Sequence, residues 1–193
     1  MKKLIISSLL FAIAFLANSL HAQEPTMEFG RVSLNHKWLT INFTKSYINP
    51  IVVAGPPTRN GGHPSVVRIQ NVTATSFQIR IQEWDYLDQW HMFENVSYIV
   101  VEKGRHNMPN GTVLEAGSID LLNSTLKTKN FLNAIPTLPA VFASVATFND
   151  PSAVTQRLKD VNQNSFRAKM QEEEANDGIH ASETLNFIAM EKV

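Results

Sequence analysis

Residues 82–94 combine carboxylates, a histidine and aromatic rings within one short segment. The candidate binding side chains of this segment are Trp84, Asp85, Tyr86, Asp88, Trp90, His91 and Glu94. An aromatic face can stack on the apolar face of a sugar ring, and carboxylates and histidine can hydrogen-bond its hydroxyl groups. This combination predicts a carbohydrate-binding loop. The alternative is that Trp84 and Tyr86 cap a hydrophobic core while the polar side chains order the loop.

The polar residues of the same segment allow a second interpretation, an ion site built from Asp88, His91 and Glu94. Carboxylates alone suit Ca²⁺, whereas histidine together with carboxylates suits Zn²⁺. The order Asp-x-x-His-x-x-Glu matches no recognised metal motif, so a charge-paired network that orders the loop is favoured. No cofactor is assigned, and Ca²⁺ stays an open option.

The chain repeats itself: residues 51–103 recur as residues 140–192 at a constant offset of 89 positions, with no gap. A fixed period of this length indicates two copies of one structural unit. The second-copy equivalents of Arg68, Asp88, His91 and Glu94 are Arg157, Asp177, His180 and Glu183. The aromatic residues of the loop are not retained in the second copy. We therefore expect the first copy to bind a glycan and the second to bind it poorly or not at all.

Both copies show the period of half-buried β-strands. Residues 77, 79 and 81 are apolar and alternate with polar residues, and residues 166, 168 and 170 repeat that pattern. Glu83 falls in phase with the inward-facing set, so its carboxylate needs a partner, for which Arg68 and His91 are the candidates. Residues 96–101 and 185–190 are continuously apolar and predict central strands.

The fold class that follows is all-β, with two tandem small antiparallel β-sandwiches of about six strands each. The predicted domains are residues 27–104 and 117–193, joined by a short linker at residues 105–116 that contains an Asn-Met-Pro-Asn-Gly turn. The two domains should therefore lie close together. Domains this small bury a limited fraction of their surface, so further burial in a homo-oligomer is expected.

The N-terminus predicts export from the cytoplasm. Lys2 and Lys3 precede a short apolar segment that ends before a small residue at Ala22, so residues 1–22 are expected to be a signal peptide. The protein should be secreted, periplasmic or displayed at the cell surface. No later segment is long and apolar enough for a membrane span. Without the predicted signal peptide, the chain has 15 basic and 17 acidic residues, a net charge of −2. This charge balance does not predict binding to nucleic acid.

Catalysis is not expected. Glu83 and Glu94 could be imagined as the paired carboxylates of a glycosidase, but small repeats rarely build a deep cleft. The sequence contains no nucleophile triad spacing, phosphate loop or metalloprotease motif. The histidines His36, His63 and His106 differ between the copies and are interpreted as surface residues.

The first copy resembles the H-type lectin domain in three places. These are the turn and strand Asn71-Val-Thr-Ala-Thr-Ser-Phe77, the end of that strand at Trp84-Asp85, and the final strand Val96-Ser-Tyr-Ile-Val-Val101. The second copy keeps the resemblance more weakly, at residues 160–166 and 185–190. The resemblance implies six-stranded antiparallel sandwiches, a trimer, and a sugar of the galactose or N-acetylgalactosamine type bound near a subunit boundary.

The resemblance also assigns roles to particular residues. Arg68 occupies the place of a sugar-contacting arginine, and Arg157 occupies it in the second copy. Trp84-Asp85 corresponds to the family's aromatic and polar pair, although a histidine is common where this chain has Asp85. The leading hypothesis is thus a secreted glycan-binding protein. The alternative is an extracellular structural or adhesive module that self-assembles through its sandwiches without binding sugar.

Overall fold

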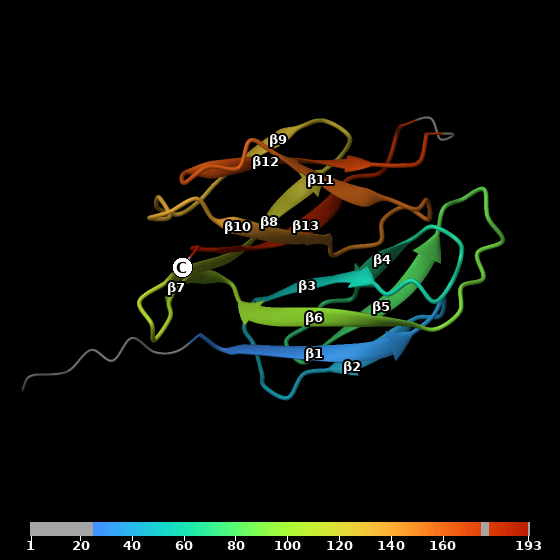
Figure 1. The fold of residues 1–193 in the computed structure, drawn as a ribbon, viewed down its shortest axis with the longest axis horizontal. Coiled ribbons are helices and arrows are strands. Elements are labelled where there is room, and N and C mark those ends of the chain that lie inside the picture. Colours follow the sequence, from blue (N-terminus) through green and yellow to red (C-terminus); the bar gives the residue numbers. More distant parts are fainter. Residues whose placement is uncertain (1–24, 175–177, 193) are drawn as a thin grey trace, which may run out of the picture.

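The computed structural model of the chain describes residues 25–174 and 178–192. Every regular element within these ranges is a β-strand, and every strand pairing is antiparallel (Figure 1). The all-β prediction is therefore confirmed. The described residues contain no helix with the length and apolar character that a membrane crossing requires. The predicted signal peptide at residues 1–22 lies outside the described residues.

The N-terminal half, residues 27–102, contains two three-stranded sheets. Its strands are β1 (Met27–Leu34), β2 (Leu39–Asn42), β3 (Pro50–Pro57), β4 (Ser65–Gln70), β5 (Ser76–Glu83) and β6 (Glu94–Glu102). The strand orders are β1-β6-β3 and β2-β5-β4. The continuously apolar β6 is the central strand of its sheet, as its sequence predicts.

The C-terminal half, residues 104–190, repeats this arrangement. Its strands are β7 (Gly104–Asn107), β8 (Val113–Leu122), β9 (Lys127–Asn130), β10 (Ala140–Val145), β11 (Thr155–Lys159), β12 (Ser165–Gln171) and β13 (Glu183–Met190). The strand orders are β10-β13-β8-β7 and β11-β12-β9. With β8 in the place of β1, the order β8-β13-β10 matches β1-β6-β3, and β9-β12-β11 matches β2-β5-β4. The central position predicted for β13 is also confirmed.

The segment interpreted as a linker differs from its prediction. Residues 105–116 include most of β7 and the first part of β8, which pair with each other from Gly104 opposite Ala116 to Asn107 opposite Val113. The Pro-Asn-Gly turn connects these two strands, and Met108 and Thr112 are joined across it by a backbone hydrogen bond of 2.8 Å. The turn residues fit a connector between domains in the sequence, but in the structure they close a hairpin that adds an edge strand to the sheet of the second half.

A separate buried cluster lies between the two sheets of each half. The inward-facing residues predicted for the alternating strands, Phe77, Ile79, Ile81, Phe166, Ala168 and Met170, are all buried. In the first half they meet Val96 and Val100 of the facing sheet, and in the second half Leu185 and Phe187. The alternation in the sequence thus sets which face of β5 and of β12 packs inward.

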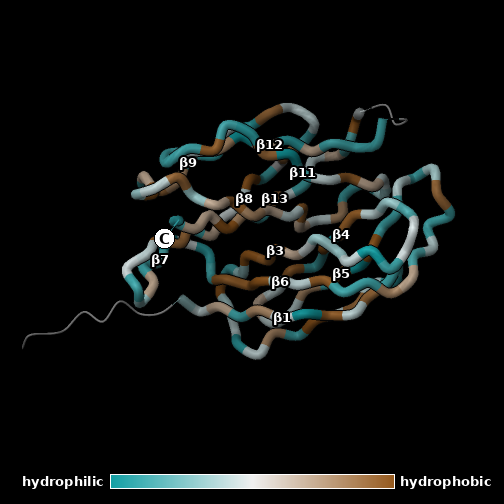
Figure 2. Tube along the Cα trace, viewed as in Figure 1, coloured by the Kyte–Doolittle hydropathy of each residue, from teal (hydrophilic) through white to brown (hydrophobic). Residues whose placement is uncertain are grey.

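A third cluster joins the two halves. Ile51, Val53 and Val101 of the first half pack with Leu114, Ala116 and Ile188 of the second. Figure 2 shows hydrophobic stretches along β3 and β6 in the middle of the molecule and hydrophilic ones along β9 and β12 at its periphery. Ser144 adds polar contacts across this boundary, because its Oγ accepts from Ala54 N at 2.9 Å and donates to Ala54 O at 3.0 Å. The halves therefore form one packed body.

Candidate functional site

The polar residues at the base of the β5–β6 loop form a buried network. His91 lies between two carboxylates, with its Nδ1 2.8 Å from Glu83 Oε1 and its Nε2 3.3 Å from Glu94 Oε1. All three side chains are buried. Strand β5 ends at Glu83 and β6 begins at Glu94, so this network closes the base of the loop. His91 is thus one of the two partners expected for Glu83.

Glu94 receives further hydrogen bonds from the segment before β4. Thr58 Oγ1 donates to Glu94 Oε2 at 2.5 Å, and the backbone N–H groups of Asn60 and Gly61 donate to Oε1 at 2.8 and 2.6 Å. Burial alone would raise the pKa of Glu94. The donors from Gly61, Thr58, Asn60 and His91 stabilise the carboxylate more strongly and bring its pKa down to about 2. The Glu94 side chain is therefore ionised and fully engaged inside the protein.

The second half contains the same network. His180 Nδ1 lies 3.1 Å from Glu172 Oε1, and its Nε2 lies 3.2 Å from Glu183 Oε1. Thr147 Oγ1 and the backbone N–H of Asn149 donate to Glu183, as Thr58 and Asn60 do to Glu94. The histidine and the two glutamates that are retained at the offset of 89 thus form the same structural network in both halves.

Protonation of the second network follows from the same contacts. Burial lowers the pKa of His180, but hydrogen bonds to Glu183 and Glu172 outweigh it and leave the pKa above its ordinary value. Burial raises the pKa of Glu183, but hydrogen bonds from His180, Thr147 and Asn149 outweigh it and leave the pKa lowered. The hydrogen bond between His180 and Glu183 therefore favours the charged form of both side chains.

The buried network corrects part of the predicted binding set. His91, Glu94, His180 and Glu183 are all buried and hydrogen-bonded inside the protein. In this structure their polar atoms are therefore engaged with one another and with the backbone, and the side chains are not exposed at the molecular surface. The predicted second-copy set also contains Asp177, which lies outside the described residues, and Arg157, which is considered below.

Arg68 is also interior, and it connects the two halves. Its side chain is 0% exposed. Its Nη1 donates to the backbone oxygen of Ser152 at 2.6 Å, and its Nη2 lies 3.2 Å from Glu183 Oε1. The guanidinium also lies 4.6 Å from the centre of the Phe148 ring. Burial lowers the pKa of Arg68 to about 10 although Glu183 opposes the shift, so the side chain remains charged at neutral pH. Its expected role as a sugar contact is wrong, because the second half covers it.

Arg157, the equivalent of Arg68, has the opposite environment. It is exposed, and its Nε donates to Gln171 Oε1 at 2.9 Å. The arginine–glutamine contact itself is repeated, since Arg68 Nη1 lies 3.2 Å from Gln82 Oε1. Only the covering of the arginine differs between the halves. The open arginine at this position therefore belongs to the second half.

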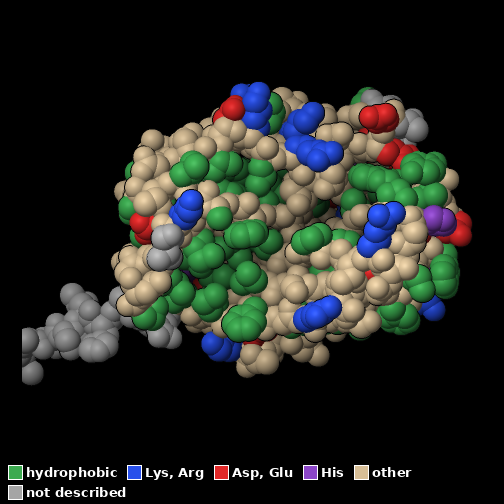
Figure 3. All heavy atoms as spheres, viewed as in Figure 1, with side chains coloured by type: hydrophobic (Ala, Val, Ile, Leu, Met, Phe, Trp, Pro, Cys, Tyr) green, Lys and Arg blue, Asp and Glu red, His purple; other side chains and the backbone are tan. Residues whose placement is uncertain are grey.

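The aromatic residues of the β5–β6 loop remain largely at the surface. Tyr86 and Trp90 are 64% and 61% exposed, Phe93 is exposed as well, and Trp84 is partly buried. Figure 3 shows hydrophobic side chains beside acidic and histidine side chains at the end of the molecule where this loop lies. The rings therefore do not fill the core. Trp90 lies against His36, with ring centres 5.8 Å apart.

Trp84 and Tyr86 line a hollow that extends into the second half. Its other lining residues are Thr155, Arg157, Gln171, Glu172, Glu173 and Glu174, and its volume is about 390 Å³. Asp85 helps to hold the two sides together, since its Oδ1 accepts from Ala153 N at 3.1 Å. The structure thus brings together Trp84, Tyr86 and Arg157, which the sequence had placed in separate copies. Sequence reasoning missed Gln171 and the three glutamates.

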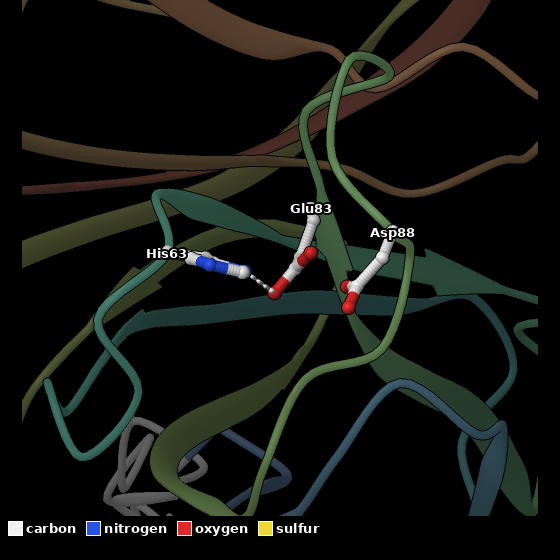
Figure 4. A group of neighbouring side chains, drawn as sticks. All are labelled: His63, Glu83 and Asp88. Atoms are coloured by element: carbon white, nitrogen blue, oxygen red, sulfur yellow. Dashed lines mark hydrogen bonds and ion pairs between the residues drawn. The ribbon is translucent and has the colours of Figure 1, made fainter.

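A second group of side chains on the first half combines Glu83 and Asp88, which the sequence analysis had considered for a site, with His63, which it had not. His63, interpreted as a surface residue, has its Nδ1 3.1 Å from Glu83 Oε1, and Asp88 lies beside the same carboxylate (Figure 4). One ligand atom from each of His63, Glu83 and Asp88 lies within 4.8 Å of the others. The backbone N–H of Trp90 donates to Asp88 and lowers the pKa of its carboxyl. No local spacing in the sequence joins His63 to a residue 20 positions away.

Comparison with known proteins gives one similarity to report. No family model matches the chain, and no solved structure matches it. Halomucin from Haloquadratum walsbyi is 36% identical to this chain over 168 residues, which covers 79% of the chain and 2% of halomucin. The chain is therefore similar to one short part of a much longer protein.

Proposed function

We propose that this protein is a non-catalytic carbohydrate-binding protein built from two tandem β-sandwiches of the H-type lectin kind. The repeated strand orders in the two halves, each around its own buried cluster, support the tandem arrangement. The motifs around Asn71, Trp84 and Val96 support the family. The similarity to halomucin is compatible with a secreted or surface-associated location, in agreement with the signal peptide expected at residues 1–22.

The proposed sugar site is the hollow between the β5–β6 loop and the second half. The observation that carries the proposal is that an aromatic pair, Trp84 and Tyr86, and the exposed Arg157 line the same hollow from different halves. A ring can stack on either aromatic face, while Arg157 and Gln171 donate to its hydroxyl groups. The site needs both halves, in contrast to the expectation that the first copy binds alone.

The chemistry of the hollow favours a neutral sugar with several hydroxyl groups. Glu172, Glu173 and Glu174 surround it with acceptors, and they disfavour an acidic sugar by like-charge repulsion. The resemblance indicates galactose or N-acetylgalactosamine. A glycan array probed with the purified protein tests the class, and binding confined to sialylated or sulfated glycans would contradict it.

Substitutions then test the position of the site. Trp84→Ala and Arg157→Ala are expected to weaken binding to the best array ligand several-fold each, because stacking and charged hydrogen bonds each contribute about 1 kcal/mol or more. Phe29→Ala and Arg59→Ala are the matched controls, since both side chains are exposed and neither lines the hollow. Unchanged glycan binding in Trp84→Ala and Arg157→Ala would show that the sugar does not bind in this hollow.

The non-catalytic part of the proposal rests on the two carboxylates considered for hydrolysis. Glu83 and Glu94 are both buried, and both bind the same histidine. They therefore do not face a substrate from two sides of a cleft, as the carboxylates of a glycosidase do. Incubation of the protein with the oligosaccharides that it binds should leave them intact.

A self-assembling module without sugar binding is the second candidate, and one observation favours it. The contact between the halves is not symmetric. Arg68 of the first half binds Glu183 of the second. Arg157 has no such cover, so the corresponding face of the second half is open to another copy of the chain. The resemblance indicates a trimer.

Light scattering of the purified protein at micromolar concentration tests assembly. An oligomer that dissociates on Arg157→Glu while the thermal stability is kept would support assembly through this face. A strict monomer would exclude the self-assembling module and leave glycan binding unaffected.

A further inference from the structure

We propose that His63, Glu83 and Asp88 form a binding site for one divalent cation of the Zn²⁺ type, placed between the β3–β4 and β5–β6 loops. The three side chains converge from separate segments, as Figure 4 shows. Nothing in the glycan-binding proposal requires them, because none of the three lines the hollow at Trp84.

Glu83 provides the fixed ligand. Its side chain is 1% exposed, and its Oε1 is held by His63 and His91 at 3.1 and 2.8 Å. Its Oε2 is buried and has no hydrogen-bond partner among the described residues. A buried carboxylate oxygen without a donor is costly, since it has lost its water and gained nothing in return. A cation beside Oε2 would remove this cost.

Asp88 adds a second carboxylate to the proposed site. Its carboxylate faces that of Glu83, and two carboxylates at this separation repel unless a proton or a cation lies between them. The backbone N–H of Trp90, 3.0 Å from Asp88 Oδ1, favours the ionised form of Asp88. Two carboxylate groups that face each other at this distance are a geometry that a bound cation can bridge.

The donor set selects the kind of cation. Ca²⁺ takes six to eight oxygen ligands, whereas one imidazole nitrogen with carboxylate oxygens suits Zn²⁺ and similar metals. In a tetrahedral Zn²⁺ site neighbouring ligand atoms lie roughly 3.3 Å apart. The ligand atoms of the present group lie within 4.8 Å of one another, so metal binding requires the two exposed ligands, His63 and Asp88, which lie outside the strands, to move closer. Exposure of these two side chains leaves a fourth position open to water.

The second half provides an internal contrast. Glu172 also has a buried Oε2 without a partner among the described residues, but Ser152 stands at the position of His63. Ser152 offers no imidazole, and its backbone oxygen accepts a hydrogen bond from Arg68. The expected stoichiometry is thus one cation per chain, bound in the first half.

A cation at this site would tie two loops together. Asp88 lies between Tyr86 and Trp90 in the aromatic loop, and His63 lies in the loop before β4. If the proposed sugar site is correct, metal binding should restrict the segment that carries Trp84 and Tyr86 and so tighten glycan binding. Metal binding itself does not depend on that function.

The test is isothermal titration of the purified, tag-free protein with Zn²⁺ after treatment with a chelator, with no sugar present. We expect one Zn²⁺ per chain, no saturable Ca²⁺ binding, and a rise in the unfolding temperature with Zn²⁺. His63→Ser, which introduces the residue of the second copy, and Asp88→Asn should each weaken Zn²⁺ binding by tenfold or more. Asp160→Asn is the matched control, because Asp160 is exposed in a turn and Asn71 stands at the equivalent position.

The outcomes separate the two proposals. Zn²⁺ binding that is absent, equal in all variants, or replaced by saturable Ca²⁺ binding would overturn the cation site. Loss of glycan binding in Trp84→Ala with Zn²⁺ binding intact would support both proposals. Tight Zn²⁺ binding by a protein that binds no glycan on the array would retain the cation site and reject the sugar site. Unfolding curves of His63→Ser and Asp88→Asn verify that both variants are folded.

Discussion

Arg68 and Arg157 occupy equivalent positions in the two halves but have opposite environments. Both lie on the strand that follows the first loop of the repeat, and each contacts a glutamine on the neighbouring strand, Gln82 or Gln171. Arg68 is covered by the second half and binds Glu183, whereas Arg157 lies open at a hollow beside Trp84. The arginine with this shared local contact thus bridges the two halves at one site and is exposed at the other.

The difference between Arg68 and Arg157 shows that one repeat unit can place the same side chain in two different environments. The buried carboxylate–histidine network is present in both halves, so it is part of the fold. The environment of the arginine depends on what packs against it: Arg68 is buried against the second half, and Arg157 is exposed. Removal of equivalent side chains from the two halves should therefore have unequal effects.

The largest expected effect is on stability. Arg68→Ala removes the cation beside the buried Glu183 and should lower the free energy of unfolding by about 3–5 kcal/mol, because a buried charge loses its partner. Arg157→Ala should change it by less than about 0.5 kcal/mol, as for other exposed side chains. Urea unfolding followed by tryptophan fluorescence measures both, and similar losses in the two variants would invalidate the comparison.

The next effect is acid destabilisation through the repeated network. The pKa of Glu94 is held at about 2, below its ordinary value near 4.5, so its contribution to stability is complete above pH 4.5 and is lost as the pH falls towards 2. The raised pKa of His180 acts in the opposite sense, and its contribution is lost as the pH rises through that pKa. The urea midpoint should therefore fall steeply below pH 4.5. A constant midpoint from pH 4.5 to 2 would show that these contacts do not contribute.

A smaller effect separates the partly buried Trp84 from the exposed Trp90 in glycan binding. Trp84→Ala should weaken binding several-fold, since its ring lines the hollow. Trp90→Ala should weaken it less, because Trp90 lies against His36 and does not line the hollow. Calorimetry with the best array ligand measures the difference. A larger loss in Trp90→Ala would place the sugar on the other side of the loop.

The smallest effect concerns the boundary between the halves. Ser144→Ala removes the two hydrogen bonds to the backbone of Ala54 and should lower the free energy of unfolding by about 1 kcal/mol. Gly55, at the equivalent position in the first half, has no side chain to make such contacts, so no matching loss exists there. Thermal unfolding measures the change. A loss of stability as large as that in Arg68→Ala would contradict the expectation that Ser144 contributes only these two hydrogen bonds.

The repeat and the alternation were sufficient to predict much of the fold. Phe77, Ile79 and Ile81 are buried as expected, and β6 and β13 are central strands, because these features depend on local patterns of side-chain burial. The prediction of a linker at residues 105–116 was wrong, because the same turn residues fit both a linker and a hairpin. The position of His63 was not predictable, since its contact with Glu83 depends on two loops that meet only in the folded chain.

The sequence by itself determined the inward faces of β5 and β12, the central strands β6 and β13, and the equivalence of the retained polar residues in the two copies, because period-2 burial and a fixed offset are local properties of the chain. Only the tertiary structure decided which arginine is buried and which is open. The contact of Arg68 with Glu183 joins residues 115 positions apart, and it depends on how the two halves pack. Their packing covers one arginine face and leaves the other exposed. It also places Trp84 and Tyr86 of the first half opposite Arg157 of the second.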